Sequence, residues 1–168
     1  MARFVQFLTV AAMLLCGAWA HAAEPLPQPT GPVILTISGR IAVTNAPGQA
    51  RFDRAMLDAL GTSSFQTGSA WSDRVELFEG VPLKAVLDRV GAAGTKMTAS
   101  ALNDYEIDIP FTDLQFSPLL AMRVDGRELT IRDKGPLWIV YPRDDHEELK
   151  SEMFDSRWVW QLKQLRVE

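Results

Sequence analysis

The sequence predicts an α+β fold with a mixed β-sheet core and short inserted helices. Many short segments show the alternation or the β-branched content typical of strands, whereas few segments carry apolar residues at helical spacing. Strand and helix segments do not alternate regularly, which disfavours a doubly wound parallel sheet. The part of the chain from residue 33 onward has the size of one domain.

The first half of this domain predicts strands and two helices. The strands are expected at residues 33–39, 63–67 and 75–78. Asp53 can cap a short helix that ends at Gly61, because an Asp side chain accepts from the free N–H groups of a first turn and Gly tolerates the backbone angles of a helix end. A second helix is expected over residues 83–90, where apolar residues recur at helical spacing.

The second half predicts further short strands. They are expected at residues 96–102, 105–109, 119–124, 128–131 and 158–167. Asn103-Asp104 separates the first two and is typical of a hairpin turn. Residues 111–114 fit a single helical turn, and the acidic residues 144–150 fit a short helix or a loop.

The stretch from Arg132 to Pro142 combines a turn with a buried strand. Residues 133–136 carry turn chemistry, since Gly reaches backbone angles that other residues avoid and Pro cannot donate to a strand ladder. Residues 137–141 are apolar and too few for a helix, so they predict a central strand covered on both faces. A rigid strand that begins at a charged turn is a common position for a binding site.

The N-terminal segment has the layout of a secretory signal peptide. Arg3 precedes an apolar run, and small residues of the Ala-x-Ala type follow it. The run is shorter than the about 20 residues of a membrane span, so we expect cleavage rather than a membrane anchor. Residues 1–23 are therefore predicted as signal peptide, 24–32 as an extended Pro-rich leader without packed structure, and 33–168 as one periplasmic domain.

Composition excludes several classes of function. The one cysteine, Cys16, lies in the predicted signal peptide, so the secreted chain would hold no disulfide, no thiolate metal site and no cysteine nucleophile. The formal net charge is −4 and there is no basic block, which argues against nucleic acid and against stable membrane insertion. Glycine-rich phosphate-binding motifs are absent.

His146 is the one histidine after the predicted signal peptide, so a Ser-His-Asp triad would have to use it. It lies in the charged run 143–148, which could also supply a metal site from Asp144, Asp145, His146 and Glu147. Neighbouring residues of a helix point in different directions, so a solvated charged surface is the favoured interpretation. We therefore predict neither a catalytic residue nor a metal ligand.

The aromatic residues are more informative. The domain carries Trp71, Trp138, Trp158 and Trp160, accompanied by Tyr105 and Tyr141. Several Trp side chains together often line a pocket for a flat ligand, and plain core packing is the alternative. Alternation along the last predicted strand places Trp158 and Trp160 on one face.

Four sequence blocks carry a resemblance to a known family. They are FEGVPL at 78–83, LLAMRVDGREL at 119–129, GPLWIVYP at 135–142 and the closing LRV at 165–167. Their order and spacing resemble the molybdopterin-binding domain of the sulfite oxidase type, over residues 33–167. The resemblance implies an α+β domain whose mixed sheet core holds a pyranopterin with molybdenum.

The residues that the family uses for this cofactor are replaced here. Thr67 stands where the family has its molybdenum-ligating cysteine, and a hydroxyl is no substitute for a soft thiolate. Trp138 stands at the arginine that pairs with the cofactor phosphate, and Trp158 and Trp160 stand at a Ser and a Lys that face the pterin. The chain is therefore most similar to small, stand-alone periplasmic members that lack the cysteine and bind pterins in signalling.

This resemblance implies a set of candidate ligand contacts. A pterin needs an aromatic face for stacking, for which the candidates are Trp71, Trp138 and Trp160. Its amino and oxo edge needs hydrogen-bond partners. The candidates for that edge are Asn103, Asp104, Tyr105, Asp133, Lys134, Ser156 and Arg157, each of which also fits a turn or a surface position.

The resulting hypothesis is a non-catalytic periplasmic protein that binds a reduced pterin, without a covalent cofactor or a metal, and reports to the periplasmic domain of a membrane-bound signalling enzyme. One alternative is a molybdopterin-dependent oxidoreductase with an atypical ligand set. A third is an interaction domain whose pocket is filled by its own Trp side chains and whose acidic residues 144–148 dock onto a partner.

Overall fold

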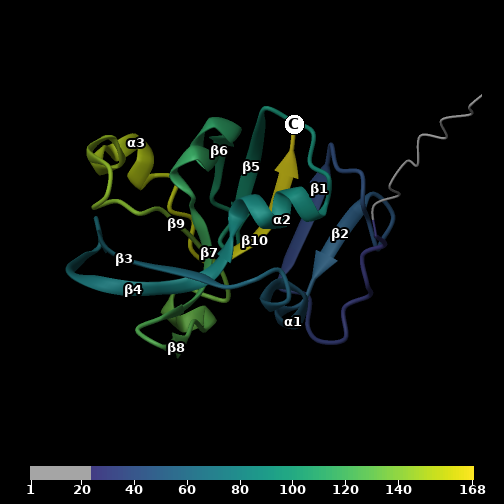
Figure 1. Ribbon diagram of the computed structural model, residues 1–168, viewed down its shortest axis with the longest axis horizontal. Coiled ribbons are helices and arrows are strands. Elements are labelled where there is room, and N and C mark those ends of the chain that lie inside the picture. Colours follow the sequence, from purple (N-terminus) through teal and green to yellow (C-terminus); the bar gives the residue numbers. More distant parts are fainter. Residues whose placement is uncertain (1–23) are drawn as a thin grey trace, which may run out of the picture.

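The computed structural model describes residues 24–168 (Figure 1). The predicted signal peptide, residues 1–23, lies outside the described residues. Within residues 24–168, no helix has the length and apolarity that a membrane crossing requires. The strands form two sheets with short helices between them, which confirms the predicted α+β fold.

The first sheet is mixed. It holds β1 (Leu35–Gly39), β2 (Gln49–Phe52), β5 (Lys96–Ala101), β6 (Glu106–Pro110) and β10 (Leu162–Val167), in the order β2-β1-β10-β5-β6. β1 and β10 are parallel, whereas the other pairs are antiparallel. The C-terminal strand β10 therefore lies at the centre of this sheet, between β1 and β5.

The second sheet is antiparallel and carries the long hairpin that runs across the view in Figure 1. Its strands are β3 (Ser63–Ser69), β4 (Ser72–Pro82), β7 (Leu119–Val124), β8 (Arg127–Glu128) and β9 (Trp138–Val140). β7 pairs with β4 along one edge and with β9 and β8 along the other. The turn between β3 and β4 is the tip of the hairpin.

Helical segments are short. They are the α-helices α1 (Arg54–Asp58), α2 (Leu83–Arg89) and α3 (Glu152–Asp155) and the 3-10 turns η1 (Phe111–Phe116), η2 (Ile131–Asp133) and η3 (Glu147–Lys150). The predicted cap is confirmed, because Asp53 Oδ1 accepts from Met56 N at 2.9 Å. The predicted apolar face of α2 is also confirmed, since Leu83, Val86 and Leu87 are buried.

The predicted central strand at 137–141 needs a correction. Its burial on both faces is confirmed, but β9 has three residues and pairs with β7 alone among the strands. Its other side meets the irregular segment before β10, where Ile139 N donates to Val159 O and Leu162 N donates to Leu137 O. An irregular chain segment thus takes the place of a neighbouring strand.

The last strand begins later than predicted. β10 starts at Leu162, so Trp158 and Trp160 precede it and the alternation argument does not apply to them. Gln161, just before the strand, has a φ of 52°, a left-handed conformation that interrupts extended structure. The predicted strand at 128–131 is likewise reduced to Arg127–Glu128, because the chain turns into η2 at Ile131.

The first half also departs from prediction in two places. The predicted strand at 75–78 is part of the longer β4, which includes Pro82. The leader 24–32 forms no helix or strand, yet it is packed: Leu26 is buried and Arg89 donates to the carbonyls of Glu24 and Pro25. Asp53 Oδ2 accepts from the backbone N–H groups of Thr30 and Gly31 and fastens the leader to α1.

Candidate binding site

The tip of the β3–β4 hairpin is fastened by one tryptophan. Trp71 occupies the turn, and its ring centroid lies 5.3 Å from that of Trp160 and 5.9 Å from that of Trp158. The indole is still 41% exposed. The hairpin tip therefore packs on the segment before β10 through aromatic contacts, with one face of Trp71 accessible to solvent.

A cavity of about 200 Å³ lies at this contact, and we call it the aromatic pocket. Three parts of the chain form its walls: the hairpin tip, the β5–β6 turn and the connection from α3 to β10. The residues that matter for its chemistry are Trp71, Asn103, Tyr105, Asp155, Ser156 and Trp160. The cavity is below the about 300–1,000 Å³ of sites for drug-sized ligands, so it suits one small ring system.

Tyr105 connects two of these walls. Its hydroxyl donates to the carbonyl of Ser156 at 2.8 Å, and its ring is 41% exposed. Asn103 Oδ1 accepts from Tyr105 N at 3.2 Å, which orders the β5–β6 turn. Among residues 24–168, the amide nitrogen Nδ2 of Asn103 donates to no acceptor, so it is available to a ligand.

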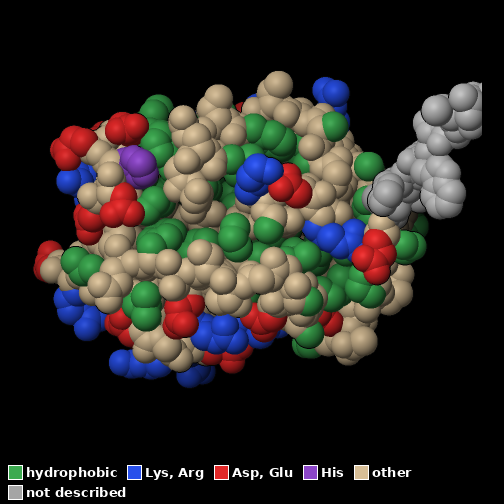
Figure 2. Space-filling view, viewed as in Figure 1, with side chains coloured by type: hydrophobic (Ala, Val, Ile, Leu, Met, Phe, Trp, Pro, Cys, Tyr) green, Lys and Arg blue, Asp and Glu red, His purple; other side chains and the backbone are tan. Residues whose placement is uncertain are grey.

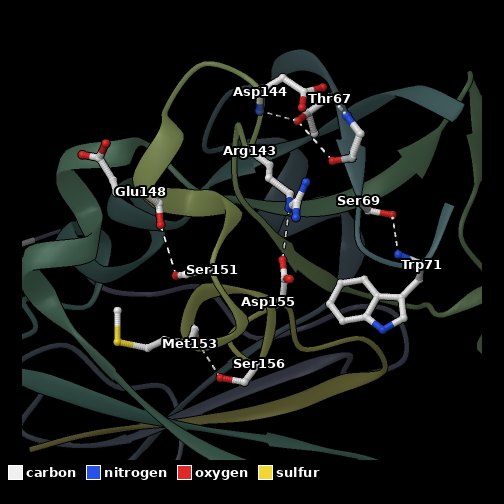
Figure 3. A network of polar contacts seen from close by, with 11 residues as sticks. Thr67, Ser69, Trp71, Arg143, Asp144, Glu148, Ser151, Met153, Asp155 and Ser156 are labelled. Atoms are coloured by element: carbon white, nitrogen blue, oxygen red, sulfur yellow. Dashed lines mark hydrogen bonds and ion pairs between the residues drawn. The ribbon is translucent and has the colours of Figure 1, made fainter. Parts of the chain in front are cut away.

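Asp155 supplies a carboxylate to the aromatic pocket. Its Oδ1 accepts from Arg143 Nε at 3.1 Å, and both side chains are about a fifth exposed. Figure 3 shows one carboxylate oxygen directed at Arg143, with the Trp71 ring nearby. Sequence reasoning named the neighbours Ser156 and Arg157 but missed Asp155. The only local signal is the polar triplet Asp155-Ser156-Arg157.

Trp158 forms the floor of the aromatic pocket. It is 2% exposed, and within the described part of the chain its Nε1 has no hydrogen-bond partner. A buried donor without an acceptor costs about 1–3 kcal/mol.

A second cleft, of about 470 Å³, lies on the other side of Trp71. We call it the charged cleft, because basic and acidic side chains line it in equal number: Arg74, Arg127, Arg132 and Lys134 with Glu76, Asp125, Glu128 and Asp133. Lys134 Nζ lies 4.4 Å from the ring centroid of Trp138 and 5.9 Å from that of Trp160. Lys134 therefore lies beside both the charged cleft and an aromatic wall of the pocket.

The predicted ligand contacts separate into three groups. Trp71, Asn103, Tyr105, Ser156 and Trp160 meet at the aromatic pocket. Asp133, Lys134 and Trp138 line the charged cleft, and Asp133 accepts from Thr130 Oγ1 at 2.7 Å. Asp104 and Arg157 line neither site, because Asp104 pairs with Lys163 at 2.8 Å and Arg157 with Asp113 at 2.8 Å.

Trp138 belongs mainly to the core. It is 2% exposed and packs edge-on against Phe78 at 5.3 Å and Trp158 at 5.8 Å. Replacement of such a side chain by Ala costs about 3–5 kcal/mol of stability, so a Trp138→Ala protein would not isolate a ligand contact. Stacking in the aromatic pocket falls to Trp71 and Trp160.

Molybdopterin does not fit the residues at the position that the resemblance assigns to the metal ligand. Thr67 is fully buried, and its hydroxyl donates to Gly68 O at 3.2 Å and accepts from Asp144 N at 3.1 Å (Figure 3). Asp144 Oδ2 in turn accepts from Gly68 N at 2.6 Å. The hydroxyl is thus used in fastening the 143–145 segment to β3, and residues 24–168 contain no thiolate.

His146 packs against an aromatic ring and lies among acidic side chains. Its ring lies 5.1 Å from that of Phe116, and Figure 2 shows the histidine surrounded by acidic side chains. Within residues 24–168, no group of three or more His, Cys, Asp or Glu side chains is placed to hold a metal ion. The run Asp144–Glu147 therefore does not form the metal cluster that its spacing left open.

Comparisons with known proteins show a similarity in fold alone. No protein-family model matches the chain, and no curated protein matches it significantly in sequence. Among solved structures, a chain of the sulfane dehydrogenase SoxCD from Paracoccus pantotrophus is similar, with a TM-score of 0.61 and 18% sequence identity. The likeness covers 79% of this chain but 37% of that one. It supports the predicted fold, and the activity of the dehydrogenase does not transfer with it.

Proposed function

We propose that the protein is a non-catalytic pterin-binding protein whose ligand lies in the aromatic pocket. The proposal rests on one observation: Trp71, Trp160 and Tyr105 meet around a small cavity that also contains the carboxylate of Asp155. Flat heterocycles bind by stacking on aromatic faces, while their polar edges need hydrogen-bond partners. A reduced pterin is a single bicyclic ring of this kind, and the cavity leaves little room for a larger ligand.

The rival function, oxidoreduction with molybdopterin, is supported by the fold, since the similar solved structure is a sulfane dehydrogenase. It requires a metal ligand where Thr67 is already used in two hydrogen bonds. It also requires space where Trp138 and Trp158 pack edge-on against each other and against Phe78. The fold is compatible with the cofactor family, but these side chains are not.

We further propose that the protein works in the periplasm as a sensory partner of a membrane-bound signalling enzyme, like the small stand-alone proteins that it resembles. The predicted signal peptide supports the compartment. Trp71 supports the signalling role, because it lines the pocket and is also 41% exposed at the hairpin tip. A ligand that changes the packing of Trp71 would change a surface that a partner can contact.

Calorimetric titration of the purified protein with tetrahydropterin tests the binding function. Saturable binding is expected, and Trp71→Ala should weaken it by the about 1–3 kcal/mol that one aromatic stacking contact with a base contributes, or about 5- to 150-fold. The matched control is Val75→Ala, on the same hairpin, because Val75 is 63% exposed and does not line the pocket. A folded wild-type protein that binds no pterin would overturn the proposal.

Extraction of the protein purified from the periplasm tests the non-catalytic assignment. The denatured supernatant is analysed by mass spectrometry for pteridines and for molybdenum. A metal-free pterin supports the proposal. Molybdenum together with a phosphorylated pyranopterin would establish the oxidoreductase alternative, whatever Thr67 contributes.

A further inference from the structure

We infer that Asp155 determines the specificity of the aromatic pocket, and that it selects flat heterocycles that carry an amino group next to a ring N–H. This inference rests on the proposed function, since it names the chemical edge of the ligand that the same pocket binds. Asp155 was not among the residues that the sequence or the family resemblance indicated.

One oxygen of the Asp155 carboxylate is not used by the described part of the protein. Oδ1 accepts from Arg143 Nε at 3.1 Å, but within residues 24–168 nothing donates a hydrogen bond to Oδ2. The side chain is only 19% exposed and lines the cavity. In Figure 3 the Asp155 carboxylate lies between the Arg143 guanidinium and the Trp71 ring, and both Asp155 and Trp71 line the pocket.

The carboxylate can accept more than the one hydrogen bond from Arg143. An ionised carboxylate only accepts hydrogen bonds, and its two oxygens offer about four lone-pair sites. An amino group and an adjacent ring N–H present two parallel donors, which match Oδ2 and the remaining lone pair of Oδ1 in the way that a guanidinium matches a carboxylate. A ring with an oxo group at the same position would direct its lone pairs at the carboxylate and would be repelled.

Arg143 makes this recognition possible for a neutral ligand. Its guanidinium balances the carboxylate, so a neutral ring can cover Asp155 without leaving a buried unpaired charge. The backbone of Arg143 is itself held, because its N–H donates to Tyr141 O at 2.8 Å at the end of β9. The carboxylate is thereby oriented before a ligand arrives, which lowers the entropic cost of binding.

The remaining free groups of the pocket are donors. Trp158 Nε1 is buried without a partner, and Nδ2 of Asn103 finds no acceptor within the described chain. A complementary ligand therefore carries donors on the edge that meets Asp155 and acceptors elsewhere on the ring. An aminopyrimidinone ring, as in pterin, has this distribution.

Two ring systems that differ at one position test the inference. Pterin carries an amino group where lumazine carries an oxo group, and both are titrated calorimetrically in a buffer acidic enough to keep the two rings neutral. We expect wild type to prefer pterin by about 10- to 150-fold, the range for a hydrogen bond to a charged group. Asp155→Asn should reduce that preference to within about 3-fold, because an amide can donate to the oxo group of lumazine.

The control is Asp145→Asn, an exposed acid of the 143–148 run that does not line the pocket, and it should keep the wild-type preference. Equal wild-type affinities for the two rings would overturn the role of Asp155 while leaving the heterocycle function intact, and this arm needs no variant. An Asp155→Asn protein that folds and still prefers pterin about as strongly as wild type would also overturn it. Binding of none of pterin, lumazine and tetrahydropterin by wild type would overturn the proposed function itself.

Discussion

Asp155 and Arg157 lie two residues apart at the end of α3, and each forms an arginine–carboxylate pair of a different kind. Arg157 Nη1 donates to both oxygens of Asp113, at 2.9 and 2.8 Å, and Tyr141 Oη donates to Oδ2 of the same carboxylate at 3.0 Å. Arg143, by contrast, uses one oxygen of Asp155. Both oxygens of Asp113 accept hydrogen bonds within the protein, and we call the Asp113–Arg157 pair the closed pair. Within residues 24–168, Asp155 keeps one oxygen without a donor at the wall of the aromatic pocket, and we call the Asp155–Arg143 pair the open pair.

The difference separates a structural pair from a binding pair. Asp113 is 3% exposed, and burial raises the pKa of the Tyr141 phenol well above its usual 10.0, with the adjacent Asp113 charge acting in the same direction. Tyr141 therefore remains a donor at all physiological pH values. Every oxygen of Asp113 is satisfied, so nothing is left for a ligand.

The largest expected effect on stability comes from removing the carboxylate of the closed pair. Asp113→Ala leaves Arg157 with its side chain 14% exposed and without its counter-ion. Loss of one partner of a buried pair costs about 3–5 kcal/mol, because the other charge stays desolvated. Chemical denaturation should show this loss against the exposed control Asp145→Ala. A loss below about 1 kcal/mol would mean that the pair is as solvent-screened as an ordinary surface pair.

The second largest expected effect on stability comes from removing the hydroxyl of Tyr141. Tyr141→Phe removes one hydrogen bond to a charged group and should cost about 1.5–3 kcal/mol of unfolding free energy. The pKa of Tyr141 is raised in the folded state, so the folded protein holds this proton more tightly than the unfolded chain does. Its contribution is fully present below pH 10.0 and is lost as the pH rises above that value.

The pH dependence gives an independent check on this assignment. Unfolding of wild type and Tyr141→Phe is compared at neutral pH and at rising alkaline pH. The stability difference between the two proteins should stay constant at neutral pH and shrink in alkali. A difference that grew in alkali would contradict the buried, neutral phenol.

Local patterns predicted those parts of the fold that depend on few residues. The Asp53 cap of α1 and the apolar face of α2 follow from adjacent positions, and both are confirmed. The last strand was placed too early because the left-handed Gln161 gives no signal in a hydrophobic pattern. The apolar run 137–141 predicts a central strand, but one side of β9 is covered by an irregular segment rather than by a second strand.

The sequence predicts part of the stacking set and part of the polar edge of the candidate site. Trp71 and Trp160, predicted for stacking, and Asn103, Tyr105 and Ser156, predicted for the polar edge, line one cavity, whereas the third stacking candidate, Trp138, does not. Local sequence patterns do not indicate Asp155, because its role depends on a cavity whose walls come from three distant parts of the chain. Arg157 is predicted as a partner for the polar edge of the ligand, but it pairs with Asp113, which lies 44 residues away, and no local feature indicates that pair.

The smallest expected effect on stability comes from the open pair, and it separates the two pairs most sharply. Asp155→Asn keeps the shape of the side chain and removes a charge that is paired through one oxygen. A partly exposed pair of this kind contributes about 0–1 kcal/mol, so the unfolding free energy should fall by no more than that. Asp113→Asn, measured beside it, should lose clearly more stability and leave the pterin-to-lumazine preference unchanged. If Asp155→Asn were instead the more destabilised protein, the carboxylate at the pocket would be a structural element, and the free oxygen would have to be explained by packing rather than by a ligand.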